Sequence, residues 1–272
     1  MRIPVYQVDA FTSRLFAGNP AAVCPLEAWL PDATMQSIAA ENNLADTAFY
    51  VRNGSGYDLR WFTPSVEVDL CGHATLASAH VIFTVRRETT ESRISFQSKS
   101  GELTVERHGD RYALDFPSRP AAEVAIHAGL VDALGAKPSL ILGARDYLCV
   151  FDSEEDVRAL RPNMEKLAAT DRFAVIATAP GDDCDFVSRF FAPAMGVPED
   201  PVTGSAHCTL IPYWSKRLGK KILHARQVSS RGGELYCEDR GDRVTIAGNA
   251  VTYLEGWIEL NYASSRSTIA ST

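Results

Sequence analysis

The stretch "EDPVTGSAHCTLIPYW" (residues 199–214) joins an acidic turn to an apolar run. Asp200 precedes a proline, and Gly204 and Ser205 stand where the apolar run begins. The run predicts a helix with almost no polar face, which Pro212 is expected to kink or to deprive of regular hydrogen bonding. The fold therefore depends on whether the chain contains a second stretch of this kind.

A second copy lies about 130 residues earlier. The segments "FQSKSGELTVERHGDR" (96–111) and "VSSRGGELYCEDRGDR" (228–243) are identical at eight of sixteen positions, without a gap. Upstream of them, "RWFTPSVEVDLCGHATLASAH" (60–80) lies over "RFFAPAMGVPEDPVTGSAHCTL" (189–210). A repeat of this length is too long for a solenoid unit and is typical of a duplicated domain.

Each copy is expected to form one α+β half, with halves at 1–118 and 119–272 and the last residues able to pack back on the first half. Strand-like alternation surrounds a helix, 72–85 in the first copy, that is apolar on every side and therefore buried. Each half is thus predicted to be a mixed β-sheet wrapped around a central helix. Arg60 and Arg189 occupy equivalent places and are expected to pair with an acid within their halves.

Charge and composition disfavour nucleic acid and membranes as partners and favour a small molecule. The formal net charge is −7 and no Lys/Arg-rich run stands out, which disfavours nucleic acid. No segment approaches the roughly 18 apolar residues of a membrane span, and the start "MRIPVYQVDAFTS" lacks a signal peptide, which predicts a cytoplasmic protein. Six cysteines without a C-x-x-C pair indicate free thiols, and no nucleotide or metal motif is present, so no cofactor and no metal are expected.

Both buried helices begin with an acid, a glycine-containing turn and a polar side chain. These residues are Asp69, Gly72 and His73 in the first copy, and Asp200, Gly204 and Ser205 in the second. Helix N-termini attract anions, and glycine lets a ligand approach the backbone. If the copies face each other, both N-termini point into one cleft that suits a small carboxylate. Ordinary helix capping is the alternative, but the occurrence of the pair at equivalent places favours a site.

A candidate acid/base group is Glu41 in "SIAAENNLADTAFYV", at the end of a predicted helix. If its side chain enters the cleft, burial would raise its pKa toward the range of a general acid or base. The alternative is a solvated helix end, which is the commoner case. His80 and His207, inside apolar helices, are interpreted as core or cleft-wall residues.

Five segments together resemble the PhzF-like isomerase family, named for phenazine biosynthesis, which shares the diaminopimelate epimerase fold. They are "VDAFTSRLFAGNPAAVC", "AENNLADTAF", "RWFTPSVEVDLCGHATLASAH", "EDPVTGSAHCTL" and "VTIAGNAVTYLEGWIEL". The resemblance covers nearly the whole chain. It implies two pseudo-symmetric halves, an active site between them and a homodimer.

By the same resemblance, the family's catalytic carboxylate falls on Glu41, its cleft histidine on His73, and its second acid and hydroxyl on Asp200 and Ser205. The implied reaction is a cofactor-free proton shift on a small carboxylate, possibly cyclic. In the founding enzymes the substrate is trans-2,3-dihydro-3-hydroxyanthranilate; here the substrate stays open. The Gly72 and Gly204 amides, with Asp69, Cys71 and Thr203 beside them, are the expected substrate-binding groups.

Two other functions remain open. An epimerase of this fold uses two cysteines on opposite faces of the substrate, and Cys71 stands at the first such position. Thr203 stands at the second, where a hydroxyl is a poor base, and Cys208 is expected to point into the core. A binding protein without activity would need the helix N-termini but not a candidate base.

Overall fold

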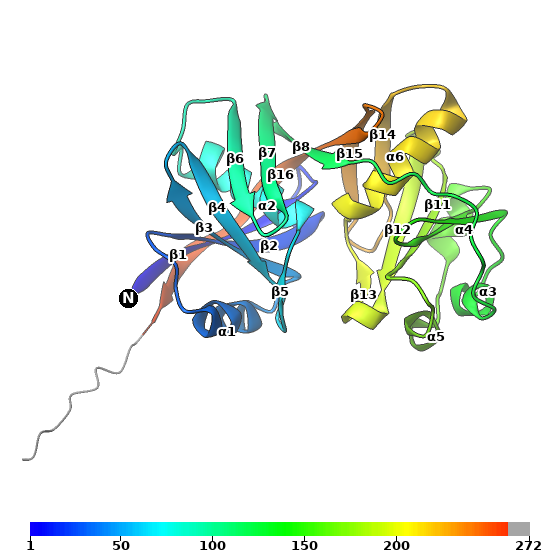
Figure 1. The fold of residues 1–272 in the computed structure, drawn as a ribbon, viewed down its shortest axis with the longest axis horizontal. Coiled ribbons are helices and arrows are strands. Elements are labelled where there is room, and N and C mark those ends of the chain that lie inside the picture. Colours follow the sequence, from blue (N-terminus) through cyan, green and yellow to red (C-terminus); the bar gives the residue numbers. More distant parts are fainter. Residues whose placement is uncertain (261–272) are drawn as a thin grey trace, which may run out of the picture.

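The computed structural model describes residues 1–260, and its first part is a closed ring of eight strands around one helix (Figure 1). The ring closes because the first strand pairs with both the second and the last. In order around the ring, its strands are β1 (Arg2–Ala10), β2 (Asn19–Leu26), β3 (Asp46–Asn53), β4 (Gly56–Phe62), β6 (Arg93–Ser98), β7 (Gly101–His108), β8 (Arg111–Pro117) and β16 (Arg243–Glu259).

Helix α2 (Gly72–His80) fills the interior of the ring and continues as one π-helical turn, Val81–Val85. Every residue from His73 to His80 is buried, as expected of a helix that is apolar on every side. Helix α1 (Asp32–Asn42) packs outside the ring through Met35, Ile38 and Ala39. The ring therefore presents the N-terminus of α2 at one of its ends.

The second part is an open sheet that shares β16 with the ring. From β16 outward, its strands are β15 (Gly233–Asp239), β14 (Ile222–Gln227), β12 (Phe186–Ala192), β11 (Val175–Pro180), β10 (Tyr147–Val150) and β9 (Leu140–Gly143). The short strands β5 (Glu67–Val68) and β13 (Val197–Asp200) pair with β4 and β12. The remaining helical segments are α3 (Leu130–Leu134), α4 (Glu154–Ala159), α5 (Met164–Ala168), the 3-10 turn Pro193–Met195 and α6 (Gly204–Leu218).

The order of pairing in the first part recurs in the second. Strands β2 and β3 are parallel neighbours, as are β10 and β11, and the parallel pair β4–β6 has its counterpart in β12–β14. Strand β16 connects the two parts, because residues 244–247 pair with β15 of the second part on one side and with β8 of the ring on the other, while Ala250–Glu259 pair with β1. The fold is thus a mixed sheet, closed into a barrel in its first part.

Helix α6 runs through Pro212 to Leu218, and the regular hydrogen bonding is interrupted at this proline, as predicted. Proline has no N–H, so Pro212 leaves the carbonyl of Cys208, four residues earlier, without its helical donor. The backbone amide of Arg119 donates to that carbonyl at 2.8 Å. The helix continues because a residue between the two parts of the chain satisfies the group that proline leaves free.

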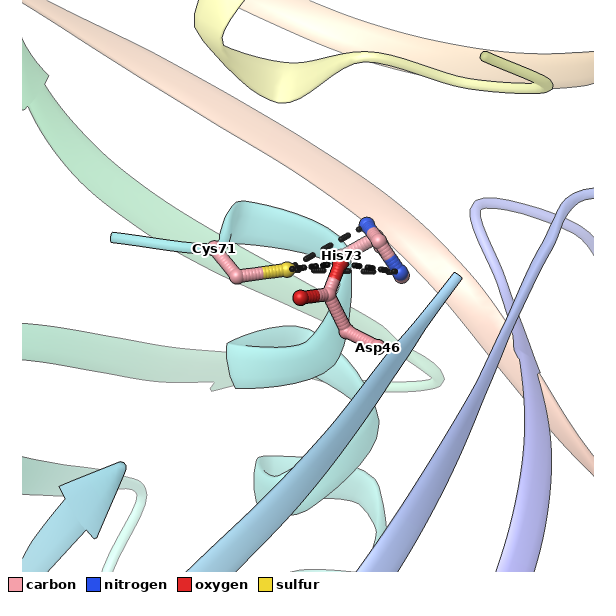
Figure 2. A group of neighbouring side chains, drawn as sticks. All are labelled: Asp46, Cys71 and His73. Atoms are coloured by element: carbon pink, nitrogen blue, oxygen red, sulfur yellow. Dashed lines mark hydrogen bonds and ion pairs between the residues drawn. The ribbon is translucent and has the colours of Figure 1, made fainter. Parts of the chain in front are cut away.

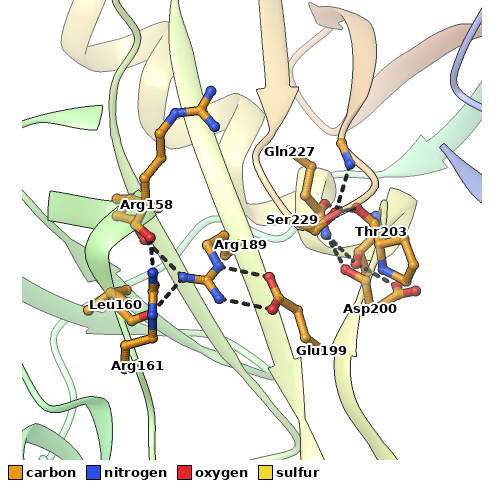
Figure 3. A network of polar contacts seen from close by, with 12 residues as sticks. Arg158, Leu160, Arg161, Arg189, Glu199, Asp200, Thr203, Gln227 and Ser229 are labelled. Carbon is orange, nitrogen blue, oxygen red and sulfur yellow. Dashed lines mark hydrogen bonds and ion pairs between the residues drawn. The ribbon is translucent and has the colours of Figure 1, made fainter. Parts of the chain in front are cut away.

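The two equivalent arginines pair with acids as predicted. Arg60 donates Nε and Nη2 to Glu67 at 2.7 and 2.9 Å. Arg189 makes the same two contacts to Glu199, at 2.7 and 2.9 Å, and donates Nη1 to two backbone carbonyls of the α4 region (Figure 3). Each pair lies just ahead of the helix that opens the candidate site, and so fixes the chain that leads into it.

The six cysteines are free thiols, as predicted, and all but Cys184 are buried. Over residues 1–260, no helix combines the length and apolar character that a bilayer crossing requires.

Candidate active site

The N-termini of α2 and α6 meet between the two parts of the molecule. A Cβ atom added to Gly72 would lie 3.8 Å from the Cα of Gly204, and one added to Gly204 would lie 3.9 Å from the Cα of Gly72. The preceding residues, Cys71 and Thr203, are both extended N-caps. The unpaired N–H groups of two helix ends are therefore concentrated in one place, which favours negative charge there.

Three side chains gather at the start of α2 (Figure 2). The thiol of Cys71 donates to Asp46 Oδ2 at 3.2 Å and lies 3.4 Å from His73 Nδ1. His73 Nε2 lies 3.6 Å from the same Asp46 oxygen. Asp46 is the first residue of β3, so the barrel wall brings it to the helix that the barrel encloses.

Burial determines the protonation of this cluster. Burial, opposed by the Cys71 hydrogen bond and helped by the nearby charge of Asp200, raises the pKa of Asp46 to about 7. Burial also lowers the pKa of His73 to about 3 and raises the pKa of the Cys71 thiol well above its ordinary value. At neutral pH the cluster holds a neutral imidazole, a protonated thiol and a carboxyl close to half-ionised.

A second carboxyl, Asp200, lies at the end of β13 and ahead of α6 (Figure 3). Its Oδ1 accepts from Asn19 Nδ2 at 2.7 Å and its Oδ2 accepts from Thr203 Oγ1 at 2.5 Å. Gln227 donates to the Asp200 carbonyl at 2.7 Å and accepts from the Thr203 amide at 2.9 Å. Burial raises the pKa of Asp200 to about 6, while the Thr203 and Asn19 hydrogen bonds oppose that rise.

Ser205, on the first turn of α6, accepts a 3.2 Å hydrogen bond from Arg145 Nη2. Arg145 is itself held by two hydrogen bonds to Asp146, whose side chain is almost fully buried. His207 lies two residues further along the helix and is fully buried. Its Nδ1 is 2.8 Å from the carbonyl of Thr203, so that nitrogen carries the proton and burial keeps the ring neutral, with its pKa lowered to about 4.

The structure brings most of the predicted residues together, but Glu41 requires a correction. His73, Cys71 and Gly72 lie at the start of α2, and Asp200, Thr203, Gly204 and Ser205 lie at the start of α6. Glu41 instead occupies the exposed side of the last turn of α1, outside the site. Asp69 is also exposed, and its backbone carbonyl, rather than its carboxylate, accepts a hydrogen bond from Ser100.

The carboxyl that enters the site is Asp46, five residues after Glu41. Asn43 ends α1 in the left-handed conformation, with φ of 48°, and this turn sends the chain into β3. The sequence stretch "NNLADTAFYV" indicates this placement of Asp46. An acid that directly precedes a strongly apolar strand lies where that buried strand begins. Sequence reasoning also missed Asn19, Arg145 and Gln227, whose contacts are all made across long sequence separations.

Among residues 1–260, the Asp46, Cys71 and His73 donor atoms lie within 4.8 Å of one another, a spacing compatible with a metal ion. Zinc ligation would require the Cys71 thiolate. That thiol instead donates to Asp46, and its pKa is raised by burial. We therefore interpret the cluster as a set of proton-carrying groups.

Comparison with known proteins places this geometry in a family. Residues 8–256 match the family described as "Phenazine biosynthesis-like protein". An uncharacterized isomerase of Pseudomonas aeruginosa is 56% identical over 96% of this chain and the whole of that protein. The crystal structure of a PhzF family protein from Enterococcus faecalis is 49% identical, has a TM-score of 0.93, and covers 96% of this chain and all of that one.

A more distant structure, a predicted epimerase from Pseudomonas aeruginosa, is 18% identical with a TM-score of 0.75, covering 95% of this chain and all of that one. This last likeness concerns the fold alone. The fold, the motifs at both helix starts and the match over most of the sequence agree, and the chain belongs to the phenazine biosynthesis-like PhzF family.

Proposed function

We propose that this protein is an isomerase that moves a proton between two carbon positions of a small carboxylate-bearing metabolite. The observation that carries the proposal is the placement of Asp46, whose side chain is only 13% exposed and accepts a hydrogen bond from Cys71, the residue before the α2 N-terminus where the two helices meet. Burial at this place raises the pKa of Asp46 to about 7. A general acid or base works best when its pKa lies near the operating pH. The isomerase names of close relatives support the same class of reaction.

The chemistry follows from the placement of the groups. The amides at the starts of α2 and α6 hold the substrate carboxylate, because helix N-termini stabilise negative charge. Ionised Asp46 removes a proton from carbon and returns it to another carbon on the same face. Neutral His73 and the hydroxyl of Ser205 orient the substrate by hydrogen bonds, and Asp200 supplies a second carboxyl in the same site.

The finer parts of this proposal rest on the resemblance to the family. They are a cyclic substrate of the dihydro-hydroxyanthranilate type, a reaction without cofactor, a cytoplasmic location and a homodimer. We further propose that the two parts are pseudo-symmetric halves that arose by duplication, which the internal repeat and the recurring pairing order support. Light scattering tests the dimer directly, since a dimer has twice the 29.7 kDa of the chain.

An epimerase is the weaker candidate. Cys71 and Thr203 do cap facing helices, as the two acid/base groups of an epimerase would. The Thr203 hydroxyl, however, donates to Asp200, and burial disfavours the Cys71 thiolate. Neither group is prepared to act as a base, whereas Asp46 is.

The proposal is tested by exchange of substrate carbon-bound hydrogen with solvent deuterium, measured by NMR and mass spectrometry on a panel of small cyclic and branched carboxylic acids. We expect wild-type protein to exchange and isomerise at least one acid, and Asp46→Asn to lose both activities. Glu41→Gln is the matched control, because Glu41 is exposed and outside the site, and it should behave as wild type. Exchange that survives in Asp46→Asn and is lost in Glu41→Gln would refute the assignment of the base.

A further inference from the structure

Asn19, the first residue of β2, reaches from the first part of the molecule into the second. Its side-chain Nδ2 donates to Asp200 Oδ1 at 2.7 Å and to the carbonyl of Val202 at 2.9 Å. A carbonyl and an ionised carboxylate can only accept, so both contacts require the NH2 end of the amide. Asn19 has no exposed surface, and the orientation of its amide is therefore determined by these two acceptors.

The backbone holds Asn19 rigidly in this place. Gly18 has a φ of +67°, and a Cβ atom there would lie 2.2 Å from the carbonyl oxygen of Ala10. The Gly18 amide donates to the carbonyl of Gly232 at 2.7 Å, and Arg231 Nε donates to the Gly18 carbonyl at 2.8 Å. The loop that carries Asn19 is thus bound to the second part of the molecule through both the N–H and the carbonyl of Gly18, the residue before it.

The two carboxyls of the site receive unequal sets of donors. Asp200 accepts from the Asn19 amide and from the Thr203 hydroxyl, one on each oxygen. Asp46 accepts from the Cys71 thiol, and its Oδ1 is buried without a partner among the described residues. A thiol is a weak donor, and a hydrogen bond to the charged form of an acid favours that form. The hydrogen bonds therefore favour ionisation of Asp200 over ionisation of Asp46.

We propose that Asn19 is a positioning residue that keeps the negative charge of this carboxyl pair on Asp200, so that Asp46 retains the proton when the pair holds one. Asn19 touches Asp200 and not the group that we assign to proton transfer, so it acts on Asp46 through Asp200. The inference rests on the proposed function in one respect, because that function assigns proton transfer to Asp46. The order in which the two carboxyls ionise can be measured in the free protein, without a substrate.

Among the described residues that donate to the Asp200 carboxyl, Asn19 is the one that comes from the first part of the molecule. Asp46 faces Cys71 and His73 from α2, and the charge of Asp200 acts on it from the second part. His73 is neutral, because burial lowers its pKa to about 3. Around Asp200, the contacts from Thr203 and Gln227 come from its own part of the chain, and neither side chain titrates.

The test is a carbon-13 NMR titration of the side-chain carboxyls between pH 4 and pH 9 in labelled protein, assigned with Asp46→Asn and Asp200→Asn. In wild type, Asp200 should ionise before Asp46. In Asn19→Ala, the Asp200 midpoint should rise by about one pH unit, and the gap between the two midpoints should close or reverse. Asn53→Ala is the matched control, because Asn53 makes the same amide-to-carboxylate contact to Asp58, at 2.9 Å, on the exposed surface. It should leave both curves unchanged.

Two outcomes would overturn the proposal. One is an Asp200 midpoint that does not move in a folded Asn19→Ala protein. The other comes from the side-chain amide of Asn19 in wild-type protein, which needs no variant and remains informative if Asn19→Ala fails to fold. Its proton shifts should follow the titration of Asp200; shifts that follow Asp46, or no titration at all, would remove the role. Neither measurement uses a substrate, so failure here is distinct from failure of the isomerase assay.

Discussion

The carboxyls of Asp46 and Asp200 come from different parts of the molecule and interact electrostatically in one site, where burial and the charge of Asp200 raise the pKa of Asp46. This arrangement destabilises the ionised form of Asp46. Its pKa therefore lies near neutral pH, where a carboxyl can act both as an acid and as a base. The consequences extend to stability, because a pKa that differs between the folded and unfolded chain makes folding depend on pH.

In wild type, we expect the free energy of unfolding to fall as pH rises, and in Asp46→Asn we expect it to fall less. With its pKa raised from 3.8 to about 7, Asp46 binds more proton in the folded than in the unfolded state across that window. The free energy of unfolding therefore falls as pH rises through it, by at most roughly 4 kcal/mol for this group. Denaturant unfolding at pH 5 and pH 8 should show a smaller difference in the variant than in wild type. An equal difference in both proteins would mean that Asp46 is not strongly perturbed.

Gly72→Ala is expected to fold normally and lose activity. The added Cβ would lie 3.6 Å from Phe116 and 3.8 Å from Gly204, which are ordinary contact distances, so stability should change by less than about 1 kcal/mol. The methyl group would nevertheless occupy the space between the two helix N-termini, and exchange activity should fall at least about tenfold. Gly248→Ala is the contrasting case, because its Cβ would lie 2.4 Å from Phe11, and it should lower the melting temperature. Full activity in Gly72→Ala would show that substrate does not bind between the helices.

Arg119→Pro should destabilise the protein relative to Arg119→Ala. Both variants lose the side chain, but only proline removes the amide that donates to the carbonyl of Cys208. An unsatisfied buried carbonyl costs about 1–3 kcal/mol, and that is the expected difference in the free energy of unfolding between the two variants. Equal stabilities would indicate that α6 tolerates Pro212 without this hydrogen bond.

Arg189→Met should be more destabilising than Arg60→Met, although the two arginines make the same paired contact to a glutamate. The Arg189 side chain is 11% exposed and also donates to two backbone carbonyls, whereas the Arg60 side chain is 20% exposed and has a second, exposed acid partner. The two ion pairs are similarly exposed, at 11% and 23% for Arg189 and Glu199 and at 20% and 15% for Arg60 and Glu67, and Glu67 keeps Lys99 as a partner. The difference therefore comes from the two backbone carbonyls, since a buried carbonyl left without its donor costs about 1–3 kcal/mol. Thermal and urea unfolding of both variants give the comparison, and equal losses would show that the two carbonyl contacts of Arg189 add no stability.

The sequence by itself determined the repeated order of elements, the two apolar helices and the polar residues at their starts. These features are readable because they depend on local spacing: the period of apolar residues predicts the helices, and a glycine-containing turn marks where each begins. The pairing of Arg60 and Arg189 with acids was also predictable, since each partner lies within ten positions of its arginine.

Only the tertiary structure decided which carboxyl enters the site and what surrounds it. Glu41 and Asp46 are separated by a single turn, and the left-handed Asn43 directs one to the surface and the other to the helix inside the barrel. Asn19 reaches Asp200 across 181 positions, and no local pattern encodes such a contact. The physical reason is that burial and long-range hydrogen bonds set the protonation of a carboxyl, and both arise only when distant segments pack together.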